Sequence, residues 1–172
     1  MPEPIKLFVF FGLPGAGKSY AANVFERFGF YIHDGDVDLP DEMRHAIATQ
    51  QPVDDTMRDE FFRRITEHVR QLLPAHPRLV LAQTFIKEKY RRRFLKTFPQ
   101  AQFVLVEAGD TLRERRLERR TNQPLEPNYT RKMVAMFEPP HIPYITINND
   151  TDGDQHLETQ IRRLVNEESE TT

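Results

Sequence analysis

The feature that most constrains this chain is a glycine-rich segment near its start, Gly12–Ser19, which reads GLPGAGKS. It fits the pattern G-x-x-x-x-G-K-S/T in full, follows the apolar run Ile5–Phe11 and leads into a helical pattern. Glycines let the backbone wrap closely around a phosphate, so that successive N–H groups point inward at the positive end of a helix. The sequence therefore predicts a phosphate-binding loop between a buried strand and a helix.

The residues of this loop are expected to hold a nucleoside triphosphate. The Lys18 ammonium is placed to reach the β- and γ-phosphates, and is therefore also a catalytic candidate. The Ser19 hydroxyl is placed to ligate Mg²⁺. The cofactors predicted from the loop are ATP and Mg²⁺, although the loop does not identify the nucleotide base. The expected nucleotide-binding residues are Gly12, Gly15, Ala16, Gly17, Lys18, Ser19 and Tyr20.

Composition restricts the class of protein further. A length of 172 residues suits one domain with a sizeable core. Lys and Arg number 24 against 26 Asp and Glu, so no overall charge favours a nucleic-acid or membrane partner. The absence of cysteine excludes a disulfide framework and favours the cytoplasm. No apolar run is long enough to cross a membrane, and the start lacks the form of a signal peptide.

Short apolar runs alternate with helical patterns along the chain. This alternation is typical of βαβ units and predicts an α/β fold, with a parallel sheet covered by helices on both faces. We expect one domain over 1–166 and a polar tail at 167–172. The expected strands are 7–11, 30–33, 79–83, 103–107 and 144–147. The expected helices are 18–28, 41–49, 54–73, 87–98, 111–120, 128–137 and 155–165.

Two carboxylates, in Asp34-Gly35-Asp36, directly follow the second expected strand. Parallel strands end at the sheet edge where ligands bind, so both side chains should lie near the phosphate loop. We assign Asp34 to the metal, and Asp36 to orienting or deprotonating a substrate hydroxyl. Asp-Gly is also ordinary turn chemistry. The neighbouring phosphate loop favours the functional interpretation.

Further motifs follow the phosphate loop and the Asp-Gly-Asp sequence in a fixed order. They are Pro40, Pro52–Arg58, Lys87–Arg91, Arg116–Arg120 and Phe137–Pro140. Together they resemble the gluconate kinases, within the shikimate kinase-like small-molecule kinases, over residues 5–140. The resemblance implies a P-loop NTPase fold with a five-stranded parallel core. It also implies Mg-ATP as donor, a substrate-binding helical segment and a mobile lid at approximately 120–128.

Several positions depart from the gluconate kinase pattern. Leu39 stands where the family has His, Ala46 where it has Lys, and Phe61 where it has Trp. In the lid, Asn122–Pro124 replaces Gly-His-Phe. Several polar groups that suit a sugar acid are therefore missing. We predict a more apolar and less cationic acceptor pocket, with weak or absent phosphorylation of gluconate.

Basic residues near the expected lid are further catalytic candidates. Arg116 and Arg120 are four apart and share one helix face, from which they would stabilise charge on the transferring phosphoryl group. The alternative is a solvated helix in which Glu114 and Glu118 pair with the arginines.

Other polar residues are candidates to bind the substrate. Arg58 and Arg91 would hold an anionic acceptor group, with surface ion pairing as the alternative. Gln83 and Thr84 follow the third strand, where they would either contact the substrate or cap the next helix. The six histidines show neither H-x-x-x-H nor H-E-x-x-H spacing, so the sequence predicts no zinc site, and His33 is expected to fill a strand end.

The function that these expectations favour is transfer of the γ-phosphoryl group of Mg-ATP to a hydroxyl of a small molecule, in a monomer or homodimer. One alternative is a kinase of nucleotides or nucleic-acid ends on the same fold, although the near-neutral chain makes a nucleic-acid partner unlikely. The other is a nucleotide-dependent switch without metabolic activity.

Overall fold

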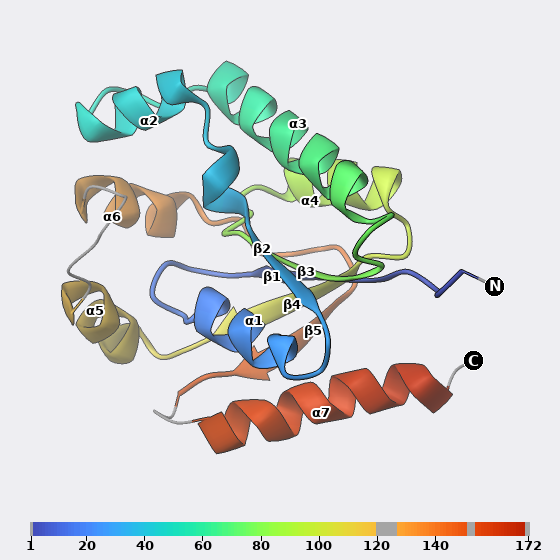
Figure 1. Cartoon of the computed structure of the whole chain (residues 1–172). Helices are drawn as coiled ribbons and strands as arrows, with labels where there is room; N and C mark the ends of the chain where they lie inside the picture. The colour runs from blue at the N-terminus through green and yellow to red at the C-terminus, as the bar shows by residue number, and fades with distance from the viewer. Residues whose placement is uncertain (1, 120–126, 151–153, 171–172) are drawn as a thin grey trace.

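The structure is a computed structural model and describes residues 2–119, 127–150 and 154–170 of the chain (Figure 1). The predicted catalytic residue Arg120 and most of the expected lid lie outside the described residues. None of the helices within these ranges is both long and apolar enough to cross a membrane.

Five parallel strands form one sheet at the centre of the molecule, in the order β2-β3-β1-β4-β5 (Figure 1). The strands are β1 (Lys6–Phe11), β2 (Tyr31–Asp34), β3 (Arg78–Ala82), β4 (Gln102–Glu107) and β5 (Tyr144–Asn148). The expected five-stranded parallel sheet is confirmed. In this order the carboxyl ends of β1, β2 and β3 are neighbours, which brings the segments that follow them together.

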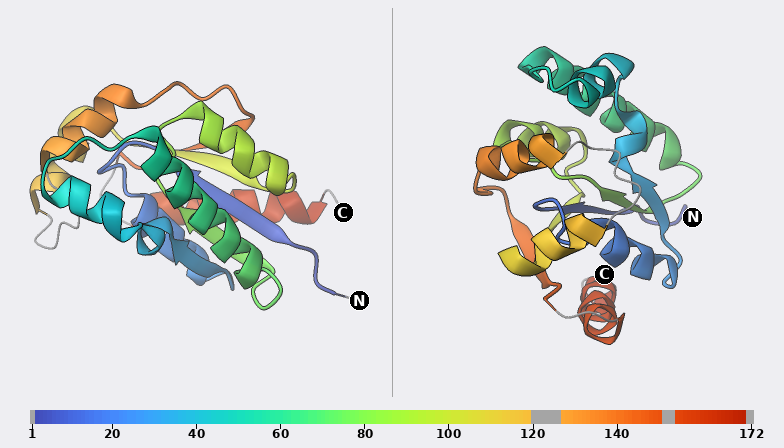
Figure 2. Two further views of the ribbon diagram at one scale, coloured as in Figure 1. Left: turned by 90° about the horizontal axis from the view of Figure 1, so that it is seen from above. Right: turned by 90° about the vertical axis from the view of Figure 1, so that its left-hand side faces the viewer.

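Helices cover both faces of the sheet, as predicted (Figure 2). The helices are α1 (Lys18–Glu26), α2 (Asp41–Ala48), α3 (Asp55–Leu72), α4 (Glu88–Thr97), α5 (Asp110–Arg119), α6 (Pro127–Met136) and α7 (Asp154–Glu170). A short 3-10 helix, η1 (Gly35–Asp38), follows β2. Helices α1 and α7 lie on one face, and α3 and α4 lie on the other (Figure 1). Helix α7 continues to Glu170, into the segment expected to be a polar tail.

Successive residues of β1 point to opposite faces of the sheet and so enter two separate cores. Leu7, Val9 and Phe11 belong to the core beneath α3 and α4. Phe8 and Phe10 belong to the core formed with α1 and α7. A strand buried on both faces must be apolar throughout, which is why 7–11 is a continuous apolar run. This burial fixes the start of the phosphate loop firmly in the sheet.

Candidate active site

The loop after β1 has a backbone that requires glycine. Gly12, Gly15 and Gly17 have φ values of +145°, +79° and +88°. A Cβ at Gly12 would lie 2.6 Å from the carbonyl oxygen of Val106, and one at Gly15 would lie 2.6 Å from that of Arg113. Larger residues would therefore be strained and would clash with neighbouring backbone. A glycine cradle of this kind, opening helix α1, fits a phosphate group.

Side chains from the loop itself and from other elements donate hydrogen bonds to the carbonyl groups of the loop. Lys18 Nζ donates to the carbonyl oxygen of Leu13 at 3.0 Å, within the loop itself. Asn149 Nδ2, from the segment after β5, donates to Ala16 at 2.9 Å. Arg116 Nη1 donates to the same carbonyl at 3.2 Å, and its Nη2 donates to the carbonyl of Asn149 at 2.7 Å. In this arrangement Arg116 supports the loop, and its action on the transferring group stays a prediction.

The two carboxylates of the Asp-Gly-Asp sequence lie beside this loop but have different surroundings. Asp34 ends β2, is exposed, and accepts a hydrogen bond at Oδ1 from the backbone N–H of Asp36 at 3.0 Å. Asp36, in η1, accepts at Oδ1 from Gln83 Nε2 at 3.0 Å. Gln83 Oε1 in turn accepts from the N–H of Thr84 at 2.7 Å. Gln83 thus orients Asp36 from the end of β3.

One pocket brings most of the predicted site residues together. The polar residues that line it include Lys18, Ser19, Asp34, Asp36, Gln83 and Thr84. The apolar residues that line it include Leu39, Met43, Ile47, Phe61, Phe62 and Met133. Leu39 and Phe61, which replace His and Trp of the gluconate kinase pattern, thus line the pocket, and Ala46 is buried in α2. The pocket lining thus combines charged and polar side chains with a larger set of apolar ones.

Arg58 places one cation in the wall of this pocket. It lies near the start of α3 and is only 6% exposed. Its Nη1 lies 3.8 Å from Oδ1 of Asp55, an exposed carboxylate, and its Nη2 lies 3.8 Å from Sδ of Met136. Its Nε is buried without a hydrogen-bond partner in the described part of the chain. A buried guanidinium so weakly paired is suited to an anionic ligand.

Arg91 does not line the pocket, and its predicted role in binding the substrate is wrong. The side chain is fully buried. It donates to the carbonyl oxygens of Phe85 at 2.8 Å and Glu138 at 2.9 Å, and pairs with Glu88 at 2.8 Å. Its guanidinium also lies over the ring of Phe137, 4.9 Å from the centroid. Each of the three guanidinium nitrogens donates at least one hydrogen bond, so Arg91 holds the chain after β3 against the chain after α6.

Tyr129 lines the pocket and was missed by sequence reasoning. It comes from the first turn of α6, directly after the expected lid, where no motif singles it out. Burial raises the pKa of its hydroxyl; the charge of Arg58 acts in the opposite direction, and that of Asp36 in the same one. Tyr129 is therefore a neutral group in the wall near both proposed acceptor-binding residues.

A family model described as an AAA domain matches residues 7–140. The chain belongs to this family. The match runs from β1 to the segment after α6, so the AAA domain includes the phosphate loop, both carboxylates and Arg58. A search of curated proteins finds no significant match.

Solved structures share the fold of this AAA domain along nearly its whole length. A sugar kinase from a Janibacter species, in unliganded form, has a TM-score of 0.80 at 19% identity, covering 94% of this chain and 95% of its own. A gluconokinase from Sinorhizobium meliloti has a TM-score of 0.75 at 20% identity, covering 98% of each chain. An APS kinase from Mycobacterium tuberculosis, in complex with AMPPNP and APS, has a TM-score of 0.63 at 21% identity, covering 96% and 98%. This AAA-domain protein therefore has the fold of P-loop kinases.

Proposed function

We propose that this protein is a kinase that moves the γ-phosphoryl group of Mg-ATP to a hydroxyl of a small anionic molecule with an apolar body. The observation that carries the proposal is one pocket whose lining includes phosphate-loop residues, Asp36 and the buried Arg58. A phosphotransferase needs a nucleotide-binding loop and acceptor-binding groups that face the same space. The likeness to sugar kinase, gluconokinase and APS kinase folds supports this reading.

The donor end of the pocket fits Mg-ATP by its chemistry. The glycine cradle suits the phosphates, and the Ser19 hydroxyl and the Asp34 carboxylate are oxygen ligands of the type that Mg²⁺ prefers. When bound, Mg-ATP supplies the phosphoryl group and the metal charge that offsets its negative oxygens. Lys18 then exchanges its bond to the Leu13 carbonyl for a phosphate oxygen. The protein contributes positioning and charge compensation.

Asp36 acts on the acceptor in this proposal. The hydrogen bond from Gln83 occupies Oδ1 and fixes the carboxylate, while the pocket it lines leaves room for a substrate hydroxyl. A fixed carboxylate beside the hydroxyl orients its oxygen for attack and accepts its proton as the new bond to phosphorus forms.

The charge and polarity of the side chains that line the pocket indicate which class of acceptor it binds. Since Arg91 is fully engaged in the core, Arg58 is the described arginine placed to bind an acceptor anion. The apolar residues Leu39 and Phe61 provide no partner for a chain of hydroxyl groups. A site without matching polar groups offers no hydrogen bonds to the hydroxyl groups of a polyol such as gluconate and therefore does not favour its binding. We therefore propose a carboxylated or similarly anionic acceptor that is less hydroxylated than a sugar acid.

A coupled ADP-release screen tests the proposal. The panel contains hydroxy acids with apolar bodies, each beside its uncharged amide, and gluconate, shikimate, nucleosides and a 5′-hydroxyl oligonucleotide. We expect an acid to exceed its amide at least about tenfold in kcat/KM, and Arg58→Met to remove that preference. Arg64→Met, on the same helix but exposed, is the matched control. Preferred turnover of the oligonucleotide, or gluconate above about 10⁴ M⁻¹s⁻¹ in kcat/KM, would contradict the proposed acceptor class.

A further inference from the structure

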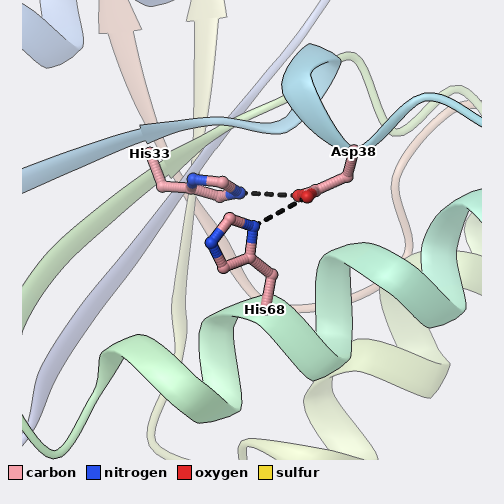
Figure 3. A group of neighbouring side chains, drawn as sticks. All are labelled: His33, Asp38 and His68. Atoms are coloured by element: carbon pink, nitrogen blue, oxygen red, sulfur yellow. Dashed lines mark hydrogen bonds and ion pairs between the residues drawn. The ribbon is translucent and has the colours of Figure 1, made fainter.

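A second cluster of polar side chains lies outside the pocket lining, where three elements meet (Figure 3). His33 comes from β2, Asp38 from the end of η1, and His68 from α3. His33 Nε2 lies 2.6 Å from Oδ2 of Asp38, and His68 Nδ1 lies 2.7 Å from Oδ1. The two imidazole rings lie against each other, with centroids 4.4 Å apart, and each directs one nitrogen at the same carboxylate (Figure 3).

The surroundings of this cluster favour a bound cation. His33 is 4% exposed and the Asp38 side chain 9%, whereas the His68 side chain is 39% exposed. The cluster is therefore closed at β2 and open to solvent at α3. Within the described ranges, both oxygens of Asp38 face imidazoles, and neither is paired with a lysine or an arginine. No fixed positive charge of the described residues thus competes for the carboxylate.

We propose that His33, Asp38 and His68 bind a divalent transition-metal ion, with Zn²⁺ as the preferred ion. Two imidazole nitrogens and one carboxylate oxygen are ligands that Zn²⁺ takes in proteins, and three protein ligands leave a fourth position for water. The three donor atoms lie within 4.8 Å of one another. When the metal binds, each imidazole carries its proton on the nitrogen that faces away from Asp38. The nitrogen that faces Asp38 then coordinates the metal and no longer makes a hydrogen bond to the carboxylate.

The adjustment that binding requires is small. Zn–N and Zn–O bonds of about 2.0–2.2 Å place tetrahedral donors roughly 3.4 Å apart, so each ring nitrogen and the carboxylate oxygen it faces must separate by roughly 0.7 Å. Asp38 and His68 would make this movement while His33 stays in place. His68 is partly exposed on the surface of α3, which gives its side chain the freedom to move. His33 is buried and fixed, so it forms the rigid side of the site.

An ion at this site would join the elements that carry the two central pocket residues. Helix η1 contains Asp36, and α3 contains Arg58. The metal would be structural, because its ligands lie outside the pocket lining. It would stabilise the fold, because the three ligands come together only in the folded chain. The site does not depend on which acceptor the protein uses.

Metal titration of the full chain tests the site. Chelator-treated protein without nucleotide is titrated with ZnCl₂ by calorimetry, and with Co²⁺ followed by visible absorption. We expect one Zn²⁺ per chain, the d–d bands of low-coordinate Co²⁺, and a rise in Tm with added Zn²⁺. His68→Gln and Asp38→Asn should each weaken Zn²⁺ binding at least about tenfold. The control His45→Gln, an exposed histidine of α2, should bind as the wild type does.

Two further conditions separate this site from the nucleotide site. Excess Mg²⁺ and the Asp34→Asn substitution should leave Zn²⁺ binding unchanged, because neither affects the three proposed ligands. Absence of Zn²⁺ binding in the wild type would overturn the proposal and leave the cluster as a hydrogen-bonded link. Equal affinity in His68→Gln, or loss of binding with Mg²⁺ or Asp34→Asn, would also overturn it.

Discussion

Gln83 Nε2 donates a hydrogen bond to Oδ1 of Asp36 at 3.0 Å, which joins the end of β3 to the 3-10 helix after β2. The contact depends on the glycine between the two aspartates. A Cβ at Gly35 would lie 2.9 Å from Gln83 Nε2 and 3.2 Å from its Cβ. The Asp-Gly-Asp sequence therefore provides both a carboxylate and the space for the amide that orients it.

Gln83→Ala should lower kcat about 10- to 100-fold, because a hydrogen bond to a charged group contributes about 1.5–3 kcal/mol. The KM for ATP should stay near its wild-type value, since Gln83 orients Asp36 and not the phosphate loop. Steady-state kinetics with varied ATP and acceptor check both parts. Gln71→Ala, on the exposed side of α3, is the control. Wild-type kcat in Gln83→Ala would show that the contact does not serve the reaction.

Arg58→Met should raise the KM for the acceptor about 10-fold or more without lowering the stability of the fold. The guanidinium leaves its buried Nε unpaired, so an apolar side chain of similar length removes an unsatisfied group. Thermal unfolding and acceptor titration of the same preparation measure the two effects. A large fall in Tm with unchanged KM would instead make Arg58 a structural residue.

Arg91→Met should destabilise the fold by about 3–5 kcal/mol, because it removes the buried partner of Glu88 and leaves that largely buried charge with only the exposed Arg92, 3.5 Å away, among the described cations. It also removes the donors to the carbonyl groups of Phe85 and Glu138. Urea unfolding measures the loss. Arg92→Met is the matched control, since that neighbouring arginine is largely exposed. Similar stability of the two variants would argue against a core role for Arg91.

Stability should fall in acid partly through Glu88. Burial tends to raise the pKa of this carboxyl, but hydrogen bonds from Arg91 and the N–H of His141 outweigh burial and hold the pKa below its ordinary value of 4.5. The stabilisation is therefore complete above that value and is lost as pH falls through the lowered pKa. Unfolding free energies measured between neutral pH and pH 3 should decline less steeply in Glu88→Gln. Equal slopes would exclude Glu88 as a contributor.

The sequence predicted the fold and the donor end of the pocket because both depend on local patterns. The apolar run at 7–11 and the glycines of Gly12–Ser19 are contiguous, so periodicity and spacing are sufficient to interpret them. Asp36 could be placed near the loop because parallel strands end at a common edge. The five-stranded sheet followed from the same strand pattern and the family resemblance.

Arg91 and Tyr129 could not be placed by the same reasoning. The partners of Arg91 are backbone carbonyls at Phe85 and Glu138, which are far apart in the sequence and carry no residue-type signal. Phe85 itself has a φ of +48°, a backbone conformation that its residue type does not suggest. Tyr129 reaches the pocket only because α6 packs beside it. Tertiary contacts determine these positions.

The histidine cluster illustrates the same limit. The histidine spacings used to search the sequence for a zinc site place both ligands on one helix. Here, His68 lies 30 residues after Asp38. The sheet brings β2 beside β3, and α3 crosses above them, so the two histidines meet through packing alone. The spacing rule predicted no zinc site, and the structure supplies a candidate.

Transfer of the γ-phosphoryl group to an acceptor is the central claim, and product analysis tests it most directly. The wild type, Lys18→Ala and Asp36→Asn are incubated with Mg-ATP and an anionic hydroxy acid from the screen, and the products are followed by ³¹P NMR. The account predicts a phosphate ester with the wild type, none with Lys18→Ala, and at least about 100-fold slower formation with Asp36→Asn. Conversion of the γ-phosphate only to inorganic phosphate, or equal ester formation by wild type and Lys18→Ala, would contradict it.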